Sequence, residues 1–330
     1  MIWIQFIACT AVIVFAGSKV SKYGDIIAEK TGLGKTWIGV LLLATVTSLP
    51  ELITGASSVA IFNVPDIAVG DVLGSCAFNL LLIALLDGLA GPEPVVTKVK
   101  PGQVLTAAFG TLMLGMVCLS LALGTKVPRI GWVGINSILF LLIYVIAMRL
   151  IFLYEKKRAA EFFEEVFETH PETMTLRQAY FRYAMFALLI VSAATWLPHL
   201  GEQIAQITGL ERSFVGSIFI AISTSLPEMV VSVAALRIGA VDLAFGNVLG
   251  SNLFNIAILA LDDVMYKPGP LLTVISGSHL ITAIAAIIMT AITVIGLTYK
   301  TNRKYMFLSA DAWGILLIWL TATFYLYILG

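Results

Sequence analysis

The sequence predicts an all-α polytopic membrane protein with ten transmembrane helices, arranged as two inverted five-helix repeats. The composition is the first reason: 59% of the 330 residues are hydrophobic and 12% are charged, whereas a soluble domain carries about 25% charged residues. The second is a motif that occurs twice, TSLPE, at residues 47–51 and 224–228. The chain is therefore expected to reside in a lipid bilayer, and its net charge of zero indicates no nucleic-acid partner.

Long segments without Asp, Glu, Lys or Arg mark most of the membrane spans. Each is close to the ~20 residues that a helix needs to cross the hydrocarbon core, and none alternates as a barrel strand does. The charge-free segments are 1–18, 101–125, 130–148, 183–201, 243–261, 268–299 and 312–330. The ten expected spans are 2–28, 36–61, 66–90, 101–124, 129–154, 178–206, 212–238, 242–262, 270–297 and 306–329.

The Lys and Arg residues predict how these spans are oriented. If the N-terminus is extracellular, 16 of the 20 Lys and Arg residues fall in loops on the cytoplasmic side, where basic residues accumulate. The expected location is the cell membrane, as a multi-pass protein with both termini extracellular. The expected domains are a first five-helix repeat (1–154), a cytoplasmic connecting segment (155–177) and a second five-helix repeat (178–330).

The two halves share more than the TSLPE motif. TSLPELITGASSVAIFNVPDIAVGDVLGSCAFN begins at Thr47, and TSLPEMVVSVAALRIGAVDLAFGNVLGSNLFN begins at Thr224. Equivalent residues are 177 positions apart at the motif and 176 apart after it. Because five spans is an odd number, the second copy must be inverted relative to the first. Inverted repeats place a substrate site near the bilayer midplane, where broken helices meet.

The glutamates of the two motifs are the strongest candidates for that site. Glu51 and Glu228 lie deep in hydrophobic spans with no Lys or Arg near them. A carboxylate at the bilayer centre costs roughly 2.5 kcal/mol or more, so a bound cation is the expected partner. Two carboxylates match one Ca²⁺ or two Na⁺; the alternative is a pair of protonated structural glutamates.

Residues around the glutamates supply further oxygen atoms. Pro50 and Pro227 each remove a helical hydrogen bond and free carbonyl groups, which are ligands for hard cations such as Ca²⁺ and Na⁺. Two polar stripes on the following spans are expected to face the glutamates; the alternative for their two serines is helix–helix hydrogen bonding. These stripes are Ser75 with Asn79 and Ser251 with Asn255.

The other acidic residues receive ordinary interpretations. Asp66, Asp71 and Asp242 lie near span starts, which favours helix capping or a vestibule. Asp87, Asp262 and Asp263 are interpreted as interfacial. An intramembrane hydrolase using the two glutamates and a passive channel are competing classes. No HExxH, nucleophile or nucleotide-loop motif is present, so neither an enzyme nor a cofactor is expected.

With these motifs in place, the sequence resembles the cation/calcium exchanger superfamily, in particular its sodium/calcium exchanger branch. The resemblance implies Ca²⁺ coordination by Glu51 and Glu228 with the carbonyl groups of Thr47 and Thr224. It also implies sodium sites drawing on Ala44, Ser48, Ser75, Asn79, Ala221, Ser225, Ser251 and Asn255. The implied function is secondary antiport of Na⁺ against Ca²⁺ by alternating access, in the lipid bilayer and without a required protein partner. The alternative is antiport of H⁺ against Ca²⁺ or another divalent cation.

The chain departs from the family pattern at several positions. The usual glycine before TSLPE is Val46 in one copy and Ser223 in the other, and Asp71 stands where many relatives have Asn. Asn79 and Asn255 are both amides, whereas some relatives carry an Asp at the second position. The loss of that acid favours sodium over proton coupling.

Overall fold

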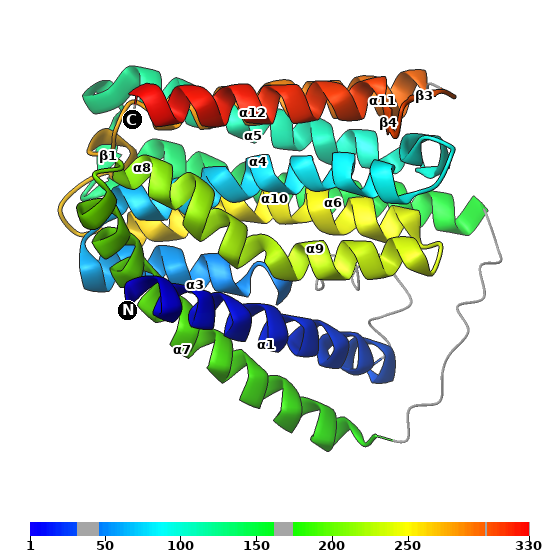
Figure 1. Cartoon of the computed structure of the whole chain (residues 1–330), viewed down its shortest axis with the longest axis horizontal. Coiled ribbons are helices and arrows are strands. Elements are labelled where there is room, and N and C mark those ends of the chain that lie inside the picture. The colour runs from blue at the N-terminus through cyan, green and yellow to red at the C-terminus, as the bar shows by residue number, and fades with distance from the viewer. Residues whose placement is uncertain (32–45, 162–173, 301, 330) are drawn as a thin grey trace.

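The computed structural model describes residues 1–31, 46–161, 174–300 and 302–329, which are almost entirely helical. The helices run roughly along one long axis (Figure 1). In the first half the elements are α1 Ile2–Lys30, α3 Leu49–Ser57, the π-helical η1 Ser58–Phe62, α4 Pro65–Leu89, η2 Val95–Lys98, α5 Gly102–Leu123, η3 Gly124–Lys126, β1 Arg129–Ile130, β2 Val133–Gly134 and α6 Ile135–Glu161. In the second half they are α7 Leu176–Thr208, α8 Arg212–Phe214, the π-helical η4 Val215–Ile220, α9 Ala221–Arg237, α10 Val241–Met265, η5 Leu271–Thr273, α11 His279–Tyr299, β3 Lys304–Tyr305, β4 Leu308–Ser309 and α12 Ala310–Leu329.

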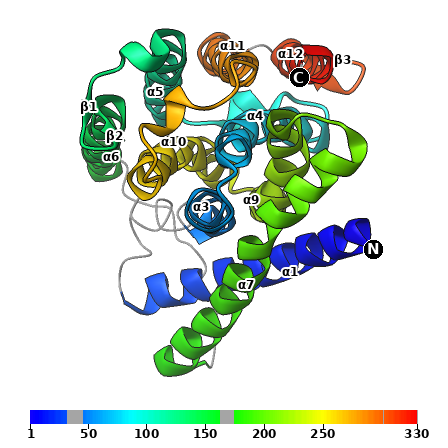
Figure 2. The same cartoon turned by 90° about the vertical axis from the view of Figure 1, so that its left-hand side faces the viewer.

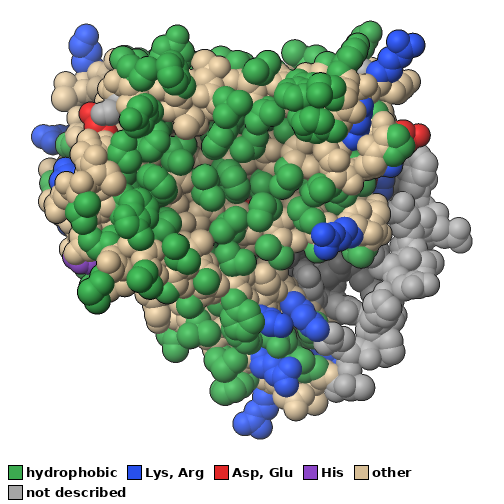
Figure 3. All heavy atoms as spheres, viewed as in Figure 1, with side chains coloured by type: hydrophobic (Ala, Val, Ile, Leu, Met, Phe, Trp, Pro, Cys, Tyr) green, Lys and Arg blue, Asp and Glu red, His purple; other side chains and the backbone are tan. Residues whose placement is uncertain are grey.

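Nine helices in the described part of the chain are long and apolar enough to cross a membrane, and Leu49–Phe62 is a shorter apolar helix. Helices α3, α4, α9 and α10 gather in the middle of the bundle, with α5, α6, α11 and α12 on one side and α1 and α7 on the other (Figure 2). Hydrophobic side chains spread over much of the outer face, while Lys and Arg lie near its ends (Figure 3). Such a surface suits contact with lipid.

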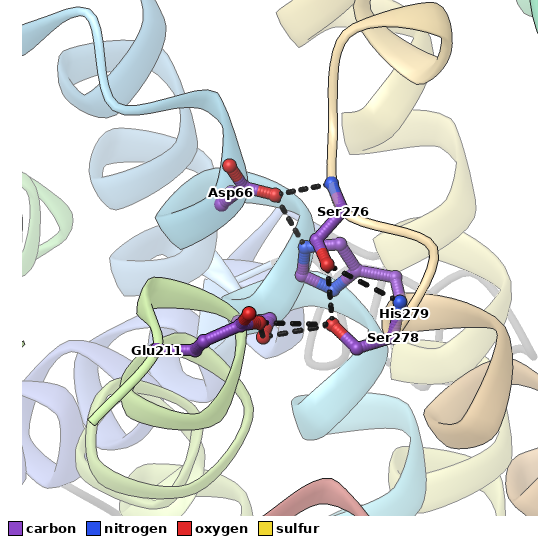
Figure 4. Close-up of polar contacts among 6 residues, drawn as sticks. Asp66, Glu211, Ser276, Ser278 and His279 are labelled. Carbon is purple, nitrogen blue, oxygen red and sulfur yellow. Dashed lines mark hydrogen bonds and ion pairs between the residues drawn. The ribbon is translucent and has the colours of Figure 1, made fainter. Parts of the chain in front are cut away.

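The two halves hold each other through equivalent aspartates at the starts of α4 and α10. Asp66 accepts a hydrogen bond from the backbone amide of Ser276 at 2.7 Å, and Asp242 accepts one from the amide of Lys100 at 2.7 Å. His279 adds a contact of 3.1 Å to Asp66 (Figure 4). Both aspartates therefore hold loops of the opposite half, a role that the expected helix caps did not include.

A second pair of equivalent aspartates holds two short hairpins. The carboxylate of Asp87 accepts a hydrogen bond from the amide of Ser309 in β4 at 2.7 Å, and that of Asp263 accepts one from the amide of Gly134 in β2 at 2.8 Å. Both aspartates are almost completely buried in the protein, two residues before the ends of α4 and α10, and their expected position at the membrane interface stays a prediction. Each contact again joins one half to the other, as an inverted repeat requires.

Three expected spans begin later in the structure, and these hairpins precede two of them, α6 and α12. Helix α6 begins at Ile135, α11 at His279 and α12 at Ala310, later than expected. Before α6, Gly131 turns the β1–β2 hairpin with a φ of 64°, and before α12 Met306 does so with a φ of 63°. The apolar residues of both hairpins resemble helical sequence, but their backbones are already paired as strands.

Both chain ends lie at one end of the bundle, near α8 and β1 (Figure 1). A chain that starts and ends on the same side crosses a bilayer an even number of times. This agrees with ten spans in two inverted repeats of five.

Candidate functional site

Glu51 and Glu228 are fully buried and each is held by the motif of the other half. The hydroxyl of Ser225 donates to Glu51 Oε1 at 2.8 Å, and the hydroxyl of Ser48 donates to Glu228 Oε1 at 3.0 Å. The second oxygen of each carboxyl group, Oε2, has no hydrogen-bond partner among the described residues. The repeated TSLPE motif therefore builds one reciprocal pair of carboxyl groups, each with a free oxygen.

The backbone is irregular on both sides of this pair. Ser48 forms a turn before α3, whose first residues include Pro50. In the second half Pro227 lies inside α9, which follows the π-helical η4. Single π-helical turns inside helices are frequent at functional sites. In the first half the helix is interrupted at Ser48, beside Pro50, whereas in the second half α9 continues through Pro227 and the irregular turns are those of η4 before it.

The threonines of the two motifs extend the site to α4 and α10. The hydroxyl of Thr224 donates to Asp71 Oδ1 at 2.8 Å and lies 3.4 Å from the hydroxyl of Ser75. In the equivalent contact, Thr47 donates to Asn247 Oδ1 at 3.2 Å. Asp71 is fully buried, so its interpretation as a helix cap or vestibule residue is wrong. In the sequence, the feature that could have placed Asp71 in the site is its alignment with Asn247 in the middle of the repeat.

The asparagines of the polar stripes lie deeper between α4 and α10. Asn79 donates through Nδ2 to Asn252 Oδ1 at 3.0 Å, and Asn252 donates to the carbonyl of Cys76 at 3.1 Å. Asn255 and Ser251 are also fully buried, and the amide of Asn255 has no hydrogen-bond partner in the described ranges. The hydrogen bond of Asn79 thus joins α4 to α10, while the hydroxyl of Ser75 adjoins that of the motif threonine Thr224. Sequence reasoning missed Asn252.

Two alanines complete the set implied by the resemblance. Ala221 is buried at the first position of α9, and its carbonyl accepts a hydrogen bond of 3.2 Å from the Thr224 hydroxyl. Ala44 lies outside the described residues, as does the first part of the span expected at 36–61.

The chemistry of the site is set by oxygen atoms. Its described side chains supply carboxyl, hydroxyl and amide oxygens, which suit hard cations. Ion pairs in the described ranges involve other carboxyl groups. They are Lys98–Glu93, Lys100–Asp242, Arg212–Glu202, His279–Asp66 and Lys304–Asp87. Within those same ranges no three His, Cys, Asp or Glu side chains form a compact metal-ligand group, so any cation here needs hydroxyl, amide or carbonyl ligands as well.

Comparison with known proteins agrees with this geometry. The family model described as sodium/calcium exchanger protein matches residues 1–153 and 179–329. The inner membrane protein YrbG of Escherichia coli K12 is 28% identical over 264 residues, which cover 78% of this chain and 77% of YrbG.

Two solved structures share the fold. An H⁺/Ca²⁺ exchanger, CAX, has a TM-score of 0.74 at 13% identity, covering 99% of this chain and 86% of that one. The sodium–calcium exchanger NCX_Mj has a TM-score of 0.60 at 19% identity, covering 98% of this chain and 95% of the other. At these identities the likeness shows the fold alone. The family match over both halves shows more: the chain belongs to the sodium/calcium exchanger protein family, whose members are transporters.

Proposed function

We propose that the protein exchanges Na⁺ for Ca²⁺ across the membrane by alternating access. The observation that carries the proposal is the buried Glu51–Glu228 pair, in which the serine of each motif binds the glutamate of the other. Ca²⁺ is coordinated by the two glutamates together with Thr47 and Thr224. Sodium ions use the oxygen atoms of Ala44, Ser48, Ser75, Asn79, Ala221, Ser225, Ser251 and Asn255.

The electrostatics of the pair explain why such a site exchanges ions instead of leaking them. Two uncompensated carboxylates buried in a low-dielectric interior are costly, so the empty site resists the dehydrated state that lies between the two open forms. One Ca²⁺ or two Na⁺ neutralise both charges and permit the switch. The switch of the site from one side of the membrane to the other thus requires bound cations, and so does the switch back.

Sodium is the proposed coupling ion because Asn79 and Asn255 are both amides. An amide offers oxygen to Na⁺ but does not exchange a proton in the physiological pH range. The shared fold does not distinguish the two modes, since one similar structure is a proton-coupled exchanger and the other a sodium-coupled one. Antiport of H⁺ against Ca²⁺ or another divalent cation is the alternative.

The coupling ion is tested with purified protein in liposomes. Radioactive calcium uptake is expected to rise when Na⁺ is loaded inside and diluted outside, and to stay at background when a pH gradient replaces it. A choline gradient of the same size is the control for osmotic effects. Calcium uptake driven by the pH gradient alone would show that H⁺, and not Na⁺, is the coupling ion. If neither gradient drove calcium uptake, exchange of calcium with either ion would be refuted.

The proposed orientation places both termini outside and the connecting segment 155–177 in the cytoplasm. Its support is the distribution of Lys and Arg in the loops, together with the position of both termini at one end of the bundle (Figure 1). Single cysteines are placed at Trp132, between β1 and β2, and at Phe307, between β3 and β4, in a chain whose native cysteines are replaced. An impermeant thiol reagent added to intact cells is expected to label position 132 and spare position 307; the reverse pattern would invert the orientation.

A further inference from the structure

A pocket of about 270 Å³ lies where α4 and α9 end and α10 begins. Figure 1 shows the turn between α9 and α10 at the end of the bundle opposite the two termini, which is the cytoplasmic end in the proposed orientation. All three helices belong to segments that are long and apolar enough to cross a membrane. The pocket therefore lies near the level at which the bilayer meets water.

The lining of the pocket combines positive charge with an apolar wall. Lys98 of η2 and Arg237, the last residue of α9, are its two cationic side chains. The apolar wall is formed by Leu89, Val233, Leu236 and Val241. An occupant that uses the whole pocket therefore has both a negatively charged part and an apolar part.

Neither cation is neutralised by a close partner in the described part of the chain. Arg237 is exposed, and the ion pairs found among the described residues do not include it. Lys98 has an ion pair with Glu93, but its length is 3.8 Å and the two side chains are 44% and 71% exposed. Exposed pairs of this kind contribute little, so both cations are available to an external anion.

The two positive charges are absent from the equivalent positions in the other half. Val274 corresponds to Lys98, and Ala60 corresponds to Arg237. The equivalent helix ends are thus built without these cations, so the fold does not require them. Basic residues on the cytoplasmic side also set the orientation of a membrane protein, but orientation does not require that two of them line the same pocket.

An anionic phospholipid matches this lining better than a soluble anion. Its phosphate carries negative charge at the level of the helix ends, and its acyl chains extend along apolar surface. The surface beside the pocket is also apolar: Leu89 is 55% exposed, and Ile238, which follows Arg237, is 77% exposed. Basic pockets between transmembrane helices bind the headgroups of anionic lipids. A soluble anion would leave the apolar wall unused.

We propose that this pocket binds an anionic phospholipid, with Lys98 and Arg237 on either side of its phosphate group. The guanidinium group of Arg237 suits two parallel hydrogen bonds to phosphate oxygens. Lys98 belongs to the first half of the chain and Arg237 to the second, so a bound lipid contacts both halves at once. It also adjoins the end of α9, the helix that carries Glu228. The existence of the lipid site does not depend on the proposed function.

The test measures lipid binding to the purified full-length chain by native mass spectrometry. The probe is phosphatidylglycerol, and phosphatidylcholine, which has no net charge, is the comparison lipid. Inorganic phosphate is the soluble anion. Lys98→Gln/Arg237→Gln removes both cations of the pocket. Lys126→Gln/Arg129→Gln is the matched control, since it also removes one exposed lysine and one exposed arginine, but beside β1 near the termini (Figure 1).

The wild type and the Lys126/Arg129 variant are expected to bind a first phosphatidylglycerol about 10-fold or more tightly than phosphatidylcholine. The Lys98/Arg237 variant should bind the two lipids equally, and Arg237→Lys, which keeps the charge, should retain most of the preference. An unchanged preference in the Lys98/Arg237 variant, or an equal loss in the control, would overturn the proposal. Displacement of the lipid by an equal concentration of inorganic phosphate would assign the pocket to a soluble anion instead. Binding is measured without transport, so a failure of the proposed exchange would leave the result unaffected.

Discussion

Glu51→Gln or Glu228→Gln is expected to lower calcium transport about 30-fold or more, because removing one partner of a buried charged contact costs roughly 2–5 kcal/mol. Glutamine has nearly the shape of glutamate and its carbonyl oxygen can still accept the serine hydroxyl. The chain should therefore fold and insert while the site loses half of its negative charge. The measurement is calcium flux into liposomes, normalised to the amount of incorporated protein.

Glu93→Gln is the matched control for this charge removal. Glu93 follows α4 in an exposed loop and makes a long ion pair of 3.8 Å with Lys98. Exposed pairs of this kind contribute little to stability, so flux should equal that of the wild type. Glutamine variants at Glu51 and Glu228 that both transported calcium as well as Glu93→Gln would remove the two residues from the ion site.

Gly74→Ala is expected to lower the thermal stability of the chain markedly. A methyl group at Gly74 would lie 2.5 Å from Ser217 Cα and 2.7 Å from Ala221 Cβ. Because the first of these atoms is backbone, α4 and η4 would have to separate, and overpacking of this kind typically costs about 1–3 kcal/mol. The measurement is the unfolding temperature in detergent, with calcium flux as a second readout because Ala221 begins the helix of the second motif.

Gly110→Ala provides the comparison, since Gly110 lies inside α5 and a Cβ there would meet nothing within 4 Å. Alanine is the better helix former by up to about 1 kcal/mol, so this variant should unfold at the wild-type temperature or above. Equal unfolding temperatures for the two variants would show that the close approach of α4 to η4 is not needed.

The sequence predicted the fold because the membrane imposes simple rules on composition and length. Charge-free segments located the spans, and two copies of TSLPE separated by five spans required inversion. The hairpin starts at Arg129 and Lys304 were not predictable in the same way. A short apolar strand and the first turn of an apolar helix have similar composition, and only pairing distinguishes them.

The candidate site was predicted where symmetry could reveal it and missed where symmetry is broken. Glu51 and Glu228 stand out because both copies keep them, and the structure places both in one buried pair. Asp71 has a neutral counterpart, Asn247, so the shared charge that marks the two glutamates does not mark it, and only its place in the middle of the repeat pointed to the site.

The most direct test of obligatory exchange compares radioactive calcium uptake into liposomes loaded with unlabelled Ca²⁺ and into liposomes that contain no Ca²⁺ or Na⁺. Without a bound cation, the site formed by Glu51 and Glu228 should not switch back to the side from which calcium entered. Uptake is therefore expected to be fast into the calcium-loaded liposomes and near background into the cation-free ones. A proton-coupled exchanger could still take up calcium into the cation-free liposomes, because the internal buffer supplies protons, so the comparison tests the sodium-coupled account. Equally fast initial uptake into cation-free liposomes, at zero membrane potential, would contradict this account and indicate a channel or a proton-coupled return.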